Sequence, residues 1–137
     1  MIPHYSKPGA EMPDGTIFVA VSPSSGKPFY TIPKDGPLDI NWYEAIEFAK
    51  SLDMYGHKDW RLPTVAEAEL LYDNREIIGN FKVPEERNES SPGKWVDYWT
   101  SSEIAGGSYA RTWNFNGGKQ LNSPMKSKKV FIRLVRG

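Results

Sequence analysis

The stretch Asp59-Trp60-Arg61-Leu62-Pro63-Thr64 decides how the middle of this chain folds, because it ends in a helix-start signal. Thr64 is followed three residues later by Glu67, which is the spacing of a capping box at a helix N-terminus. The apolar residues that follow recur at helical spacing, at Val65, Ala68, Leu71 and Tyr72. The sequence therefore predicts a helix that begins directly after Pro63.

The residues around this helix start receive structural roles. Trp60 and Leu62 are expected in the core, and Arg61 is expected to form a local ion pair rather than to bind a ligand. Three acidic residues fall off the apolar stripe and are expected on a solvated face: Glu67, Glu69 and Asp73.

Upstream of the motif, the sequence predicts a hairpin and another helix. Residues 15–21 and 28–32 have strand character and are separated by turn-forming residues 22–26. Asn41, with Glu44 three residues on, forms a second capping-box pattern and predicts a helix there. Residues 1–14 are rich in proline and are interpreted as an irregular lead-in to a single domain over residues 15–137.

Downstream of the motif, a long loop region and four strands are predicted. Residues 79–97 show no periodicity and are assigned to the loop region. The strands are expected at residues 98–102, 109–115, 119–122 and 130–136. Asn116-Gly117-Gly118, between the second and third of these, is a strong hairpin signal because both residue types accept positive backbone angles.

Four segments together carry a resemblance to a known family: Trp60–Thr64, Tyr98–Ser102, Phe115–Gly118 and Ile132–Arg136. They match a pattern of W-R-[LV]-P-T, Y-W-[ST]-S-S, F-x-x-G and V-R-x-V-R. In this respect the chain resembles the bacterial Lcl C-terminal domain family, which has a C-type-lectin-like fold. The resemblance implies an α+β domain with an N-terminal β-hairpin, two helices, a long loop region and a closing twisted antiparallel sheet.

Composition excludes several classes of protein. The 137 residues contain no Cys, so disulfide frameworks, thiol nucleophiles and thiolate metal sites are ruled out. No apolar run approaches the roughly 20 residues that span a bilayer. The N-terminus lacks the pattern of a secretory signal. We therefore expect a cytoplasmic protein, with association with a particle or export by a signal-less route as the alternatives.

Charge is distributed unevenly along the chain although the total is zero. From residue 104 onward there are seven basic residues and no acidic one, whereas the first 103 residues carry a net charge of −7. This asymmetry indicates an anionic partner or head-to-tail self-contact. The alternative is that the two halves interleave in space, so that the charges cancel.

Signals for catalysis, cofactors and metals are weak. The histidines are His4 and His57. His57 and Asp59 could supply two metal ligands, but no further residue is spaced to complete a site, and no G-x-S-x-G or phosphate-binding loop is present. The triplets typical of calcium-dependent sugar-binding lectins are also missing. We therefore expect no cofactor and no catalytic residue. A hydrolase using acids of the loop region stays open as a hypothesis, with Glu85, Glu86, Glu89 and Asp97 as its candidates.

The strand at 109–115 offers a candidate binding face. Alternation places Tyr109, Arg111, Trp113 and Phe115 on one face and the short polar side chains on the other. The family resemblance implies a binding surface around the last strands and their loops. Its expected members are Tyr109, Arg111, Thr112, Asn114, Asn116, Gln120, Asn122 and Lys126. The alternative is an ordinary polar strand surface.

Two classes of function follow from these observations. The first is a non-enzymatic binding module that recognises a glycan, a sulphated or acidic polymer, or a protein through the basic C-terminal strands. The second is a structural or assembly protein, such as a phage or secretion-particle component, that uses the fold to form homo-oligomers. Specific nucleic-acid binding is not expected, because no module signature is present.

Overall fold

The computed structural model describes residues 7–36, 40–81, 97–103, 107, 109–115, 119–121, 126 and 130–137, with only the backbone for 119–121. These residues form two antiparallel sheets of three strands each. The first sheet has the order β1-β2-β6 and contains Ile17–Val21, Pro28–Thr31 and Val135–Arg136. The second has the order β3-β4-β5 and contains Asp97–Glu103, Ala110–Asn114 and Lys119–Leu121. The predicted α+β class and N-terminal hairpin are confirmed.

The helices begin where the capping signals place them. α1 covers Trp42–Ser51 and α2 covers Val65–Asp73, and a short α3 at Arg75–Ile78 follows without having been predicted. Both capping boxes form, since Asn41 accepts from the Glu44 backbone N–H at 2.9 Å and Thr64 accepts from that of Glu67 at 3.2 Å. No helix within the described segments is long and apolar enough to cross a membrane.

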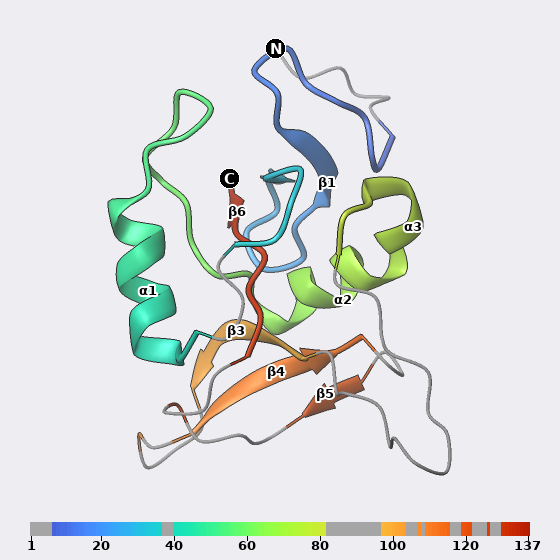
Figure 1. Ribbon diagram of the computed structural model, residues 1–137. Helices are drawn as coiled ribbons and strands as arrows, with labels where there is room; N and C mark the ends of the chain where they lie inside the picture. Colours follow the sequence, from blue (N-terminus) through green and yellow to red (C-terminus); the bar gives the residue numbers. More distant parts are fainter. Residues whose placement is uncertain are drawn as a thin grey trace, which may run out of the picture.

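The C-terminal segment differs from the predicted fourth strand of a closing sheet. Only Val135–Arg136 is a strand, and it pairs with β2 in the other sheet. Val130 bridges Ile40 and Phe131 bridges Tyr98, so residues 130–137 run from the second sheet to the first (Figure 1). Residues 132 to 135 are all buried. Apolar character alone could not distinguish this buried crossing segment from a sheet strand.

Two hydrophobic clusters lie on either side of this crossing segment. One packs α1 against Trp60, Leu62 and Trp99, together with Ile132 and Leu134. The other packs α2 against the first sheet and β4. In Figure 1, α1 lies on one side of the red C-terminal segment, and α2 and α3 lie on the other. The motif at 59–64 connects these two sides, which explains why its apolar residues are buried as predicted.

Candidate functional site

A concave pocket of about 420 Å³ lies over the helix-start motif, and we call it the Arg61 pocket. The turn after β1, α1, the motif, the start of α2, β3 and Gly137 all contribute to its lining. Its apolar side is formed by Ile46, Ala49, Trp60 and Leu62. Its hydroxyl groups come from Ser24, Ser25, Thr64 and Ser101. Its charged groups belong to Lys50, Arg61 and Glu67.

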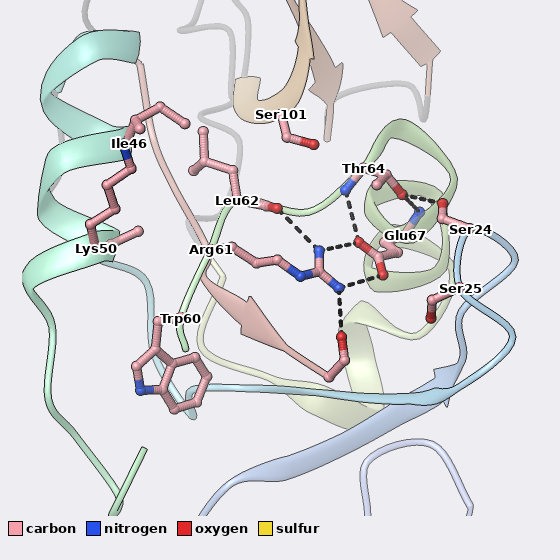
Figure 2. A pocket seen from close by; sticks show the side chains of 12 residues that line it. Ser24, Ser25, Ile46, Lys50, Trp60, Arg61, Leu62, Thr64, Glu67 and Ser101 are labelled. Carbon is pink, nitrogen blue, oxygen red and sulfur yellow. Dashed lines mark hydrogen bonds and ion pairs between the residues drawn. The ribbon is translucent and has the colours of Figure 1, made fainter. Parts of the chain in front are cut away.

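An ion pair between Arg61 and Glu67 fixes the polar part of the pocket. The Arg61 Nη1 atom lies 2.7 Å from Glu67 Oε1, and its Nη2 atom lies 2.9 Å from Oε2, as Figure 2 shows. This two-point geometry is the strong form of the arginine–carboxylate interaction. The local pairing expected for Arg61 is therefore confirmed.

Glu67 does not lie on a solvated face, so that prediction is wrong. Its side chain has no exposed surface, because Arg61 covers it and Ser22 and Thr64 complete its hydrogen bonds. The Ser22 hydroxyl donates to Oε2 at 2.7 Å, and the Thr64 backbone N–H donates to Oε1 at 2.9 Å. The capping box indicated where α2 begins. It carried no signal that the distant Ser22 would enclose the carboxylate.

The electrostatics of Glu67 favour a permanent anion. Burial raises the pKa of its carboxyl, but the hydrogen bonds from Arg61, Thr64 and Ser22 outweigh burial and hold that pKa below its ordinary value. Arg61 responds in the opposite direction, since its hydrogen bonds to Glu67 raise the guanidinium pKa. The pair is thus charged in both members and neutral in sum, and Glu67 is unsuited to donating a proton.

Several polar groups of the pocket keep hydrogen-bonding capacity. The Arg61 Nη atoms use their N–H groups on Glu67 and on the backbone oxygens of Leu62 and Gly137. No bond of the Nε–H or of the Ser101 hydroxyl is seen within the described residues. The Ser25 oxygen accepts from the Lys27 backbone N–H at 3.2 Å, which leaves its own proton to donate. The pocket can therefore both donate to and accept from a polar ligand.

The candidate face on β4 is not an exposed polar surface, and that expectation is wrong for Thr112 and Asn114. Both are buried, and the Asn114 amide donates to Asp97 Oδ1 at 2.7 Å. Both faces of β4 are covered, because Trp113 packs in the α2 cluster and Ala110 in the α1 cluster. Period-two alternation identifies two faces but cannot tell that each will be buried.

The other predicted site residues divide between exposed, buried and undescribed positions. Tyr109 is 42% exposed and Arg111 is partly exposed, so their role in binding stays a prediction. Asn116, Asn122 and the Gln120 side chain lie outside the described residues. Lys126 is only 4% exposed, which corrects its expected place on an open surface. Its Nζ atom lies 2.7 Å from Glu103 Oε2 and 4.4 Å from the Trp42 ring centre.

Ion pairs between the two halves of the chain cancel part of the charge asymmetry. Besides Lys126 with Glu103, Arg133 pairs with Asp35 at 3.0 Å and Arg136 pairs with Asp59 at 2.7 Å. Each pair joins a basic residue of the C-terminal half to an acidic residue of the first 103. For these three charges, the interleaved arrangement is the correct reading. Lys128, Lys129 and the Lys119 side chain lie outside the described residues.

The hydrolase hypothesis stays a prediction, because most of its candidate acids lie outside the described residues. The part of the chain that the structure describes holds no group of three His, Cys, Asp or Glu residues able to bind a metal. His57 Nε2 lies 2.7 Å from Asp14 Oδ2, an ion-pair geometry that the sequence did not predict. Glu85, Glu86 and Glu89 lie outside the described residues, and Asp97 is buried.

Comparison with known proteins gives one family match. Residues 23–136 match the family model described as Lcl C-terminal domain. This range includes the helix-start motif and every residue that lines the Arg61 pocket except Gly137. A search of curated proteins found no match to the chain.

Proposed function

We propose that this chain, which belongs to the Lcl C-terminal domain family, is a non-enzymatic binding module that takes a glycan-type ligand in the Arg61 pocket. The observation that carries the proposal is the two-sided lining of the pocket. Aliphatic side chains of α1 and the motif face hydroxyls of the first turn and β3. Sugars present apolar C–H surfaces and hydroxyl groups together, and a mixed lining of this kind suits both.

Family membership also supports a C-type-lectin-like fold, which we propose for this chain on that ground. The two sheets and the two main helices are compatible with it. Fold alone does not determine the ligand, so the argument for a glycan rests on the pocket.

Binding without turnover is favoured by the state of the pocket carboxylate. Glycoside hydrolysis ordinarily uses two carboxyl groups, one of which gives up a proton. The side chains that line the pocket include one carboxylate, that of Glu67, and its two oxygens are already engaged by Arg61, Thr64 and Ser22. Its lowered pKa keeps it ionised, so it supplies neither an acid nor a free nucleophile.

The pocket is a better candidate for the ligand site than the basic C-terminal strands. A sulphated polymer needs several uncompensated charges along a surface, and three of the seven C-terminal basic residues already have acidic partners. Head-to-tail assembly would depend on the same charge asymmetry, and the same three basic residues are already paired within the chain. We therefore propose recognition of a glycan in preference to recognition of a charged polymer, of another protein or of a second copy of this chain.

A glycan array tests this proposal with a variant that fills the pocket. Ser101→Trp places a large ring at the exposed rim, and Ser51→Trp adds the same ring at an exposed helix end outside the lining. We expect the unmodified chain and Ser51→Trp to bind the same glycans, with or without calcium, and Ser101→Trp to lose them. A blank array, or binding unchanged by Ser101→Trp, would contradict the proposal.

A further inference from the structure

We infer that the Arg61 pocket selects a small sugar acid, a ligand that carries several hydroxyls and one carboxylate, and that it binds this unit end-on. The inference rests on the proposed function, since it concerns the same pocket. It adds the charge and the size of the ligand, which the two-sided lining alone does not specify.

The charge of the ligand follows from Lys50. Because Arg61 and Glu67 neutralise each other at two points, Lys50 is the pocket residue whose charge is left over. Its Nζ atom lies 3.8 Å from Glu47 Oε1, and both side chains are mostly exposed. An exposed pair of this type is weak, so Lys50 can exchange it for a ligand anion. One cation that is held only by a weak exposed pair matches one ligand carboxylate.

The hydroxyls of the ligand are matched on the other side of the pocket. Figure 2 shows Ile46 and Lys50 on α1 at one side and Ser24 and Ser25 at the opposite side, with Arg61 between them. Ser25 retains a donor, whereas Ser24 already shares a 2.7 Å hydrogen bond with Thr64. A ligand spanning the pocket therefore meets a cation at one end and a hydroxyl at the other, with Ile46 against its C–H face.

The size of the pocket favours one terminal unit over a chain of sugars. Its volume of about 420 Å³ lies in the lower part of the roughly 300–1,000 Å³ range of small-molecule sites. The turn that carries Ser24 bounds it on one side and α1 on the other, and the Arg61–Glu67 pair lies between them. One sugar unit fits a pocket of this volume, whereas a longer chain of sugars would extend beyond it.

Calorimetric titration with three small probes tests the inference. D-glucuronate has the hydroxyls and the carboxylate, D-glucose lacks the carboxylate, and acetate lacks the hydroxyls. We expect D-glucuronate to bind at least about tenfold more tightly than either. Lys50→Gln should reduce this preference over D-glucose to within about twofold. Lys58→Gln is the matched control, because Lys58 is also mostly exposed, its Nζ atom lies 3.9 Å from Asp53 Oδ2, and it is not part of the pocket lining.

The outcomes separate this inference from the proposed function. Equal binding of D-glucose and D-glucuronate, both abolished by Ser101→Trp, would overturn the sugar-acid inference and leave the glycan pocket standing. Acetate binding as tightly as D-glucuronate would also overturn it, because a bare anion would then suffice. A preference for D-glucuronate that survives Lys50→Gln would overturn the argument that Lys50 binds the ligand carboxylate. Absence of binding by every probe and every arrayed glycan would contradict both proposals.

Discussion

At the scale of single residues, the Arg61–Glu67 pair is the feature on which the pocket depends. The Arg61 side chain is 36% exposed while the Glu67 side chain is completely buried, so the carboxylate cannot reach water if its partner is altered. A buried charge that loses its partner is among the most destabilising changes available to a folded chain. The pair therefore stabilises the fold, and it is already formed before any ligand binds.

Glu67→Gln should lower the free energy of unfolding by about 3 kcal/mol at neutral pH. This is the low end of the roughly 3–5 kcal/mol for breaking a buried pair, because Arg61 can still reach water. Urea unfolding followed by tryptophan fluorescence measures the change. Glu69→Gln, on the exposed side of α2, is the control and should shift stability by at most about 0.5 kcal/mol. Equal effects of the two substitutions would contradict the role given to Glu67.

The lowered pKa of Glu67 predicts a specific loss of stability in acid. Because the folded-state pKa lies below the ordinary value of 4.5, the ionised carboxylate stabilises the fold above pH 4.5. That contribution disappears as the pH falls through the folded-state pKa. Asp14, whose pKa is lowered to about 2, acts in the same direction in every variant. Unfolding free energies measured from pH 6 to pH 3 should therefore fall less steeply for Glu67→Gln than for the unmodified chain.

Two buried threonines on strands should respond in opposite ways to the same substitution. Thr112 has a hydroxyl without a hydrogen-bond partner among the described residues, whereas the Thr31 hydroxyl donates to the Leu134 carbonyl at 2.8 Å. Thr112→Val removes an unsatisfied group and should stabilise the chain by about 1 kcal/mol, while Thr31→Val should destabilise it by a similar amount. Denaturant midpoints of the two variants measure this contrast. Destabilisation by both would show that Thr112 has a partner.

For single residues, the sequence predicted the burial of large apolar side chains better than the burial of polar ones. The burial of Trp60 and Leu62 follows from their large apolar side chains and was predicted correctly. The burial of Glu67, Thr112 and Asn114 was missed, because polar residues enter a core only when distant partners or packing allow it. Ser22 lies 45 residues from Glu67, and no local pattern indicates that contact.

At the scale of elements, the helices were the most predictable parts of the fold. Both main helices start at their capping boxes, since a cap is a local hydrogen-bond pattern that the sequence displays directly. The C-terminal segment was less predictable, because its bridges to Ile40 and Tyr98 depend on where two separate sheets lie. Local propensity carries no information about that placement.

The N-cap residue of α2, Thr64, also contacts the turn that lines one side of the Arg61 pocket. The Thr64 hydroxyl caps α2 by accepting from the Glu67 backbone N–H, and it also shares a 2.7 Å hydrogen bond with the Ser24 hydroxyl. Thr64→Ala should cost about 1–2 kcal/mol, as loss of a helix cap does, and Thr64→Ser should restore most of it because the hydroxyl is kept. Thermal unfolding of the two variants checks this. Equal losses for Ala and Ser would assign the effect to the methyl group and contradict the capping role.

At the scale of the whole molecule, the two halves of the chain are held together by charge as well as by packing. Asp35, Asp59 and Glu103 each receive a basic residue from the C-terminal half. The uneven distribution along the sequence thus becomes, for these pairs, a set of internal contacts. The sequence displayed the asymmetry, but whether it is internal or external depends on the fold. The Arg61 pocket, with Lys50 at its edge, is the site that we propose for a partner.

The most direct test of the account is a titration of the ¹⁵N-labelled chain followed by amide chemical shifts. D-glucuronate and the glycans selected by the array serve as ligands. The account predicts that the largest shift changes cluster at the Arg61 pocket, at Ser25, Arg61 and Ser101, and that Ser101→Trp abolishes them. Shift changes confined to the C-terminal strands around Tyr109 and Arg111, with the pocket amides unmoved, would contradict it.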